Sequence, residues 1–314
     1  MAVWAVFGSK AMDPDVPVSV FLLMRLVIGS AFFACVIFRE TGNFSFIYKL
    51  TDIGCASKIF ISGLLAQYAS PVLYFSGALT TPGTMAAIFD GPVIPLMVFV
   101  IAVGSGVEKL PDNSHACCVV VGGLGMAAAG AGLLVVVSSS GESGGSLLSP
   151  GVVKLFFEAL ALSCSLIIQK DICHRFSVYE FSFMLTASAI VCCSLHIMVL
   201  ENYSIYEFAI QFVNKCLDNH ALLLAFLYNV VAVAGLNMML LVYANTRLPS
   251  SIVSMGACMQ PVIALFLEVL FHGVHISYGH FFAVSLVFGG IKLFSDSNNN
   301  AAPPEVDEPM KNIL

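Results

Sequence analysis

Long apolar stretches constrain this chain more than any other feature of its sequence. A helix of about 20 apolar residues crosses the roughly 30 Å hydrocarbon core of a bilayer. The sequence predicts nine such helices, at residues 16–38, 57–79, 82–103, 115–137, 151–169, 178–200, 221–242, 248–271 and 277–294. Only 10% of the 314 residues are charged, which is too few to coat a water-soluble protein of this size. We therefore predict an all-α polytopic membrane protein, largely covered by lipid.

The two ends of the chain differ from this pattern. Residues 1–12 are a tenth apolar stretch, too short to cross a bilayer alone. We interpret it as the second half of a truncated first helix, which gives about ten transmembrane helices; a short interfacial segment is the alternative. Residues 295–314 are rich in Asn, Pro and acidic residues, and we expect a disordered cytosolic tail.

Lys and Arg in the connections predict the orientation in the membrane, because cytosolic loops carry an excess of both. With residues 1–12 counted as a helix, one side carries nine basic residues and the other carries Lys10, Lys154 and Lys215. The nine are Arg39, Lys49, Lys58, Lys109, Lys170, Arg175, Arg247, Lys292 and Lys311. We predict an integral multi-pass membrane protein with a cytosolic C-terminus. Plasma membrane, endomembrane and plastid membrane all remain open.

The two halves of the chain resemble each other. Pro92-Val93-Ile94 and Pro261-Val262-Ile263 occupy equivalent places, and each is followed by a matching Gly-Gly motif, at 119–124 and 286–291. Five helices are an odd number, so a second copy inserts upside down, as in many secondary transporters. The domains predicted are a first repeat (1–137), a Ser/Gly linker (138–150), a second repeat (151–294) and the tail (295–314). Chance similarity between two apolar sequences is the alternative.

These motifs resemble the EamA-type branch of the drug/metabolite transporter superfamily, which is built from two five-helix EamA repeats. Asp90-Gly91-Pro92-Val93 and Met259-Gln260-Pro261-Val262 are similar to the "(E/Q)PV" centre of its fourth helix. Gly106-Val107-Glu108-Lys109-Leu110 resembles the turn that follows, whereas the second turn, 273–276, lacks the Glu. Trp4, the segment 7–9 and Arg25 resemble the family's opening. The resemblance implies ten helices, cytosolic termini and a central cavity between the halves.

Three charged residues lie at bilayer depth, where a charge costs at least about 2.5–3.5 kcal/mol. Asp90, beside Pro92, is expected to bind a cationic or hydroxylated solute or a proton; an ion pair with Arg25 or a surface-facing position is the alternative. Arg25 is expected to hold a carboxylate or phosphate, or else to pair with Asp90 or Glu158. Glu158 is either a proton-coupling acid or snorkels to the non-cytosolic interface.

Uncharged polar residues complete the predicted solute-binding set. Gln67 and Tyr68 mark the third helix, and Tyr228, Asn229 and Asn237 mark the eighth, its equivalent in the second half. The resemblance places both helices on the cavity, and Gln260 is the repeat mate of Gly91. The alternative for all of them is interhelical hydrogen bonding.

Two further patterns bear on partners. The glycine-rich stretch 122–132 permits close helix approach, which we assign to packing inside the first repeat, with a homodimer contact as the alternative. His272, His275 and His280 have a spacing that permits a metal site. No Cys or carboxylate joins them, so we expect no metal and no cofactor.

The function predicted is therefore secondary transport of a small organic metabolite by alternating access, with a small-molecule solute and the lipid bilayer as partners. No basic stretch indicates nucleic acid binding. An intramembrane enzyme or a channel is the alternative. The enzyme is disfavoured because Asp90 is the only aspartate in mid-span and the Gly-Ser motifs lie in loops, so no catalytic residues are assigned. The channel is disfavoured because no selectivity motif is apparent.

Overall fold

The computed structural model describes residues 18–81, 83–110, 114–138, 149–201, 205–272 and 276–300. All regular secondary structure within these ranges is helical. Nine helices of this part are long and apolar enough to cross a membrane, which confirms the predicted spans. They are Val18–Thr41, Ile53–Ala78, Ala86–Gly104, Ser114–Val137, Pro150–Lys170, Val178–Val199, Leu222–Arg247, Ser250–Leu267 and Tyr278–Asp296. The chain is an integral, multi-pass, all-α membrane protein.

Several spans are built from more than one helical element. The elements of the first half are α2 (Val18–Thr41), η2 (Ser45–Thr51), α3 (Ile53–Gly63), η3 (Leu64–Ala69), α4 (Ser70–Ala78), α5 (Gly83–Ile88), η4 (Phe89–Val93), α6 (Ile94–Gly104) and α7 (Ser114–Ser138). Those of the second half are α8 (Pro150–Lys170), η5 (Cys173–Arg175), α9 (Val178–His196), η6 (Ile197–Glu201), α10 (Ile205–Asp218), α11 (His220–Tyr228), η7 (Asn229–Asn237), α12 (Met238–Arg247), α13 (Ser250–Met255), η8 (Gly256–Met259), α14 (Gln260–His272) and α15 (Tyr278–Asn300).

Some predictions fall outside the described residues. These are the truncated helix at 1–12, most of the linker and the final part of the tail. The tail prediction is wrong for residues 295–300, because α15 continues to Asn300 as regular helix. An unpredicted element is α10, a short helix between the spans formed by α9 and α11.

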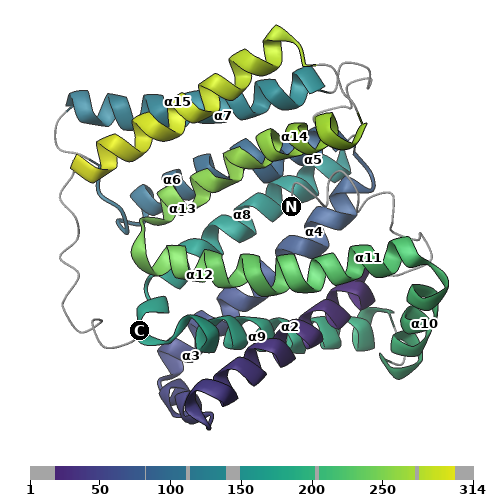
Figure 1. Cartoon of the computed structure of the whole chain (residues 1–314). Coiled ribbons are helices and arrows are strands. Elements are labelled where there is room, and N and C mark those ends of the chain that lie inside the picture. The colour runs from purple at the N-terminus through teal and green to yellow at the C-terminus, as the bar shows by residue number, and fades with distance from the viewer. Residues whose placement is uncertain are drawn as a thin grey trace.

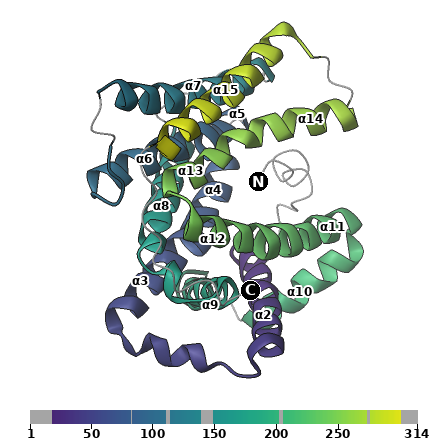
Figure 2. The same ribbon diagram turned by 60° about the vertical axis from the view of Figure 1, so that its left-hand side comes forward.

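Equivalent helices of the two halves contact one another at both edges of the bundle. Both views show α7 beside α15 at one edge and α2 beside α9 at the opposite edge (Figures 1 and 2). Between them lie α8 and the irregular spans, and η4 contacts η8. Such pairing of repeat mates is the arrangement expected from two halves related by a two-fold axis.

The α7–α15 contact depends on glycines because the two backbones touch. A Cβ atom added to Gly123 would lie 3.0 Å from the carbonyl oxygen of Gly290, and one added to Gly130 would lie 2.8 Å from that of Ala283. The prediction that this glycine-rich helix packs inside the first repeat is therefore wrong for Gly123 and Gly130. Their partner is the matching helix of the second half, because the Gly-Gly motifs of the two repeats meet there.

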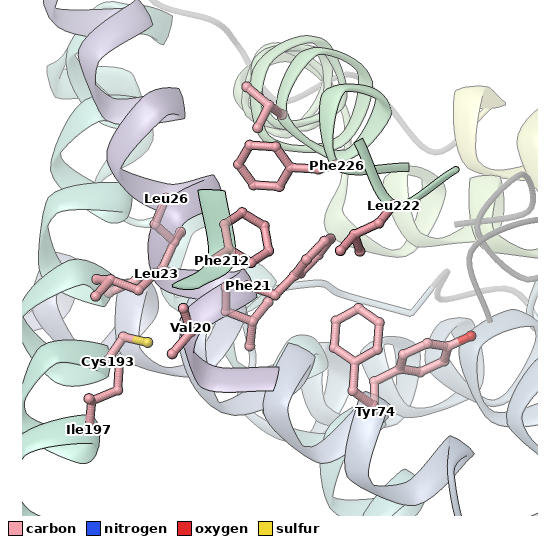
Figure 3. Packing of buried hydrophobic residues seen from close by; sticks show 14 of the residues in the cluster. Val20, Phe21, Leu23, Leu26, Tyr74, Cys193, Ile197, Phe212, Leu222 and Phe226 are labelled. Carbon is pink, nitrogen blue, oxygen red and sulfur yellow. The ribbon is translucent and has the colours of Figure 1, made fainter. Parts of the chain in front are cut away.

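The largest hydrophobic cluster gathers rings from four elements, α2, α4, α10 and α11. Phe212 of α10 lies with its ring centroid 6.1 Å from Phe21 of α2 and 5.0 Å from Phe226 of α11, both edge-on. Phe21 and Phe226 are 5.7 Å apart. Figure 3 shows these rings together, with Tyr74 of α4 at the side of the cluster. Edge-to-face contacts of this kind stabilise beyond their buried area, so α10 is fixed against α2 and α11.

Candidate functional site

Irregular helix geometry recurs at equivalent places in the two halves. The third helix contains the π-helical segment η3, and its mate, the eighth, contains the π-helical segment η7. The fourth helix contains the π-helical segment η4, and its mate, the ninth, contains the 3₁₀ segment η8. Segments of this kind are frequent at functional sites, because they free backbone groups and re-aim side chains.

Prolines account for three of these four segments. Pro92 lies inside η4. Pro71 and Pro261 each lie two residues after the end of an irregular segment, η3 and η8 respectively. Proline has no N–H and clashes with the carbonyl four residues earlier, so the regular ladder fails there. In η7 only Gly235 departs from ordinary helix formers, and the sequence offers no further reason for its geometry.

Seven of the nine predicted solute-binding residues lie within or directly beside these segments, which gives them a common structural setting. Those inside are Gln67, Tyr68, Asp90, Asn229 and Asn237, and those at a border are Tyr228 and Gln260. Arg25 and Glu158 lie instead in the regular helices α2 and α8.

The two Pro-Val centres meet. A Cβ atom added to Gly91 would lie 3.4 Å from Cγ of Pro261 and 3.8 Å from the carbonyl oxygen of Ala257. Ala257 is the residue whose carbonyl a regular helix would bond to the missing N–H of Pro261. The irregular segments of the two halves are thus in van der Waals contact at the middle of the bundle.

Two buried carboxyl groups, one from each half, lie close to this crossing. Asp90 is 5% exposed and Glu158 is 1% exposed. Ser70 Oγ of α4 donates to Glu158 Oε1 at 3.1 Å, whereas Glu158 Oε2 is buried without a partner. The charges of Asp90 and Glu158 act on each other and on the hydroxyl of Tyr74. The surface-facing alternative for Asp90 and the snorkelling alternative for Glu158 are therefore wrong.

Arg25 is buried, and no carboxylate of the described residues forms an ion pair with it. Its side chain is 2% exposed, and its Nε has no hydrogen-bond partner. Across the described residues all ion pairs join other side chains, so Arg25 is bonded neither to Asp90 nor to Glu158. The nearest electrostatic neighbour is the thiol of Cys193, whose Sγ donates to the backbone carbonyl of Ser19 at 3.3 Å. The alternative that Arg25 pairs with a carboxylate is not met.

The two polar residues of η3 are engaged with the second half. The hydroxyl of Tyr68 is hydrogen-bonded to Nδ1 of His196, at the end of α9, and the two rings meet edge-on with centroids 5.8 Å apart. Gln67 Nε2 donates to Sδ of Met238 at 2.9 Å. For both residues the structure thus shows the interhelical bonding that was the alternative to free cavity lining.

The remaining predicted residues differ in exposure. Asn229 is 2% exposed, and its Nδ2 donates only to the carbonyl of Ala225 in its own helix, at 3.5 Å. Tyr228 and Gln260 are partly buried. Asn237 is exposed, and its expected place on the cavity stays a prediction.

Three residues of the site were not predicted, although the sequence held a hint of each. Ser70 and Tyr74 are one helical turn apart, and Ser70 lies directly before a proline, so both share the face that meets Glu158. His196 is the single histidine in an otherwise apolar span. Side chains of this kind at membrane depth are rare unless they have a partner.

Charged residues gather at one end of the bundle, as the orientation argument requires. Lys58 Nζ lies 2.9 Å from Asp171 Oδ2, and Arg175 Nη1 lies 3.2 Å from Asp52 Oδ2. Each pair joins the start of α3 to the connection between α8 and α9. We call this end the basic end. Each pair is about half exposed and is therefore worth at most about 1 kcal/mol.

Two side chains at the basic end bond to backbone groups of other helices, Glu108 between the two halves and Lys170 within the second half. Glu108, from the turn after α6, accepts the backbone N–H of Ser251 through Oε1 at 3.0 Å, at the start of α13. Lys170 Nζ donates to the carbonyls of Asn245 at 2.8 Å and Leu248 at 2.7 Å, at the end of α12. An acid at a helix N-terminus and a base at a helix C-terminus both complement the helix dipole.

No group of three or more His, Cys, Asp or Glu side chains with metal-binding geometry occurs in the described part of the chain. His280 Nδ1 accepts the backbone N–H of Ser277 at 3.0 Å. The side chains of His272 and His275 are outside the described residues.

The second half of the chain resembles a known protein family. The sequence profile of the EamA-like transporter family matches residues 149–295. A crystal structure of a protein 14% identical in sequence superposes with a TM-score of 0.69, covering 96% of this chain and 94% of that chain. At this identity the likeness shows the fold alone. None of the curated protein sequences matches the chain.

Proposed function

We propose that this chain is a secondary transporter of a small organic metabolite, because residues 149–295 match the profile of the EamA-like transporter family. The observation that carries the proposal is a set of buried polar groups that lack internal partners. Arg25 Nε and Glu158 Oε2 make no hydrogen bond, although a buried polar group left unpaired is costly. A solute that satisfies them during transport explains why they are retained.

Alternating access needs points in the middle of the helices that bend, and the irregular segments supply them. Segments η3, η4, η7 and η8 lie in the interior of four spans, two in each half. Their backbone ladders are already interrupted, so changing the angle between the two ends of a span breaks few further hydrogen bonds. Gly91 against Pro261 provides a narrow crossing about which one half can tilt against the other.

Alternating access also needs end contacts that form and break. At the basic end, Glu108 and Lys170 bond backbone groups of the other helices through charge-assisted hydrogen bonds. Contacts of this kind hold the basic end closed in this conformation and are released by separation of α6 and α8 from α12 and α13. Within this scheme the nine predicted residues are candidates for solute contact, and Arg25, Asp90 and Glu158 are the strongest.

The test is counterflow in liposomes containing the full chain. Liposomes preloaded with one unlabelled solute are placed in the same labelled solute, across a panel of organic acids, amino acids, polyamines, nucleobases and sugar phosphates. A carrier accelerates entry of label when the unlabelled solute is inside, whereas a channel does not. Asp90→Asn should reduce counterflow, and Asp171→Asn, the exposed acid paired with Lys58, should not. Absence of protein-dependent movement for every class would refute the proposal.

A further inference from the structure

The charge on Arg25 is the least compensated feature of the bundle. Among the described residues it is the only Lys or Arg that is buried; all the others are exposed or partly exposed. Its Nε has no partner, and no described carboxylate forms an ion pair with it. Moving a cation away from water without a counter-ion is strongly unfavourable. Since the described residues supply no anion, a ligand anion is the natural counter-ion.

The chemistry of a single guanidinium indicates which anion fits. Its planar fork of N–H donors matches the two oxygens of a carboxylate and forms two parallel hydrogen bonds. One buried positive charge balances one negative charge. A phosphate carries up to two negative charges and would need a second cation, and the buried part of the described chain offers none. The charge balance thus favours a monocarboxylate.

The carboxyl pair completes the charge balance. Ser70 and Tyr74 face the pair from α4, Glu158 comes from α8 and Asp90 from η4. Leu22 and Leu26, on either side of Arg25 in the sequence of α2, belong to the same hydrophobic cluster as Tyr74. Two carboxyl groups buried side by side do not both carry a charge. With one proton between them, the empty protein interior carries one positive charge, on Arg25, and one negative charge, on the pair.

We propose that the transported solute is a small monocarboxylate, bound by Arg25 and carried together with one proton that the Asp90–Glu158 pair takes up. The proposal rests on the transport function proposed above. When the carboxylate binds Arg25, a second proton on the pair restores neutrality, because the site then holds the Arg25–carboxylate pair and two neutral carboxyls. The empty and the loaded site both have no net charge, so neither moves charge through the bilayer. On the far side, one carboxylate and one proton leave.

The experiment uses the full chain in liposomes with a trapped pH-sensitive dye. Monocarboxylates are compared with the primary amides of the same skeletons. Uptake of a carboxylate should acidify the lumen and stay unchanged when valinomycin and potassium set the membrane potential, and the amide should not enter. Arg25→Gln should weaken carboxylate binding at least about tenfold, measured by ligand-induced thermal stabilisation. Arg175→Gln, at an exposed ion pair, should leave binding unchanged.

Variants of the carboxyl pair separate binding from proton movement. The double variant Asp90→Asn/Glu158→Gln should still be stabilised by carboxylates but should no longer acidify the lumen, because no carboxyl is left to take up the transported proton; either single variant keeps one such carboxyl. Arg25→Gln should be at least as heat-stable without ligand as the parent protein, because it removes an uncompensated charge. A loss of heat stability would mean that Arg25 has an internal partner and would overturn the assignment.

The remaining outcomes of these experiments distinguish failure of this inference from failure of the transport function. Equal carboxylate binding by Arg25→Gln overturns the role of Arg25, and uptake that follows the membrane potential or leaves the lumen at its starting pH overturns the proton coupling. Counterflow of amides or cations, but of no carboxylate, leaves the transport function standing and overturns this inference alone. Absence of all counterflow overturns both.

Discussion

Replacing Gly290 by alanine tests the reasoning about the contact between α7 and α15. A Cβ atom at this position would lie 2.6 Å from the carbonyl oxygen of Gly123 and 2.8 Å from Cα of Ala127. Both are backbone atoms, which cannot rotate out of the way as a side chain can. The backbone nitrogen of Ala127 would lie closer still, so the two helices must separate locally by roughly 1 Å to restore ordinary contact at about 3.4 Å.

The size of the effect follows from that displacement. A gap of about 0.5–1 Å forfeits a quarter to a half of each dispersion contact along the crossing, and overpacking typically costs about 1–3 kcal/mol. Clashes with three backbone atoms argue for the upper end of this range. Alanine regains up to about 1 kcal/mol through its higher helix propensity. We therefore expect Gly290→Ala to lower the free energy of unfolding by about 2 kcal/mol.

The matched control is Gly122→Ala on the facing helix. No atom lies within 4 Å of a Cβ added to Gly122, so only the propensity gain applies and stability should rise by up to about 1 kcal/mol. Unfolding can be followed in detergent with a thiol-reactive dye, because buried free cysteines such as Cys193 and Cys258 react only after unfolding. At about 2–4 °C per kcal/mol, Gly290→Ala should lower Tm by about 4–8 °C. If Gly290→Ala melts at or above Gly122→Ala, the close crossing is refuted.

Three further substitutions test other contacts. Phe212→Ala removes the ring that joins α10 to α2 and α11 and should cost about 3–5 kcal/mol in the same melt, whereas Val213→Ala, on the exposed side of α10, should cost far less. Glu108→Ala removes the acceptor at the start of α13 and should cost about 1 kcal/mol; amide exchange in the first turn of α13 should quicken while that of α15 does not, and equal rates would contradict the bond. Ser177→Ala breaks the reciprocal capping bonds with Glu180 and should lower the free energy of unfolding by about 1 kcal/mol. An unchanged Tm would show that these capping bonds do not stabilise the protein.

The spans could be predicted because lipid imposes a length and a polarity on every helix that crosses it. The same criterion missed α10, which is 14 residues long. Its apolar residues at 206, 210, 213 and 217 recur with the helical period, but a search for runs of about 20 apolar residues passes over so short a pattern. Its buried partner surface, centred on Phe212, is visible only once α2 and α11 are in place.

The candidate site could be predicted only in part. Arg25, Asp90 and Glu158 were identified because a charge inside a membrane span must face the protein interior, and all three are buried. Their partners were not, because the relative rotation of two helices is set by packing far along the chain. Ser70 and Glu158 are 88 residues apart in the sequence, and no local sequence pattern predicts a contact between residues so far apart. The glycines of α7 likewise predicted that another helix packs closely against α7, but not which helix it is.

The two halves share their backbone plan but not their charges, and this difference bears on the mechanism. Asp90 belongs to the fourth helix, whereas the equivalent place in the ninth carries the uncharged Met259. The second carboxyl, Glu158, comes instead from the first helix of the second half. The pair is therefore shared between the halves, one acid from each. Repulsion between two like charges grows as they approach in a medium of low dielectric. Any tilt of one half against the other about Gly91 and Pro261 changes that separation, and so changes how tightly the pair holds its second proton. The same tilt of one half against the other therefore changes both the proton affinity of the Asp90–Glu158 pair and the side of the membrane from which the solute can enter. Coupled transport requires this linkage.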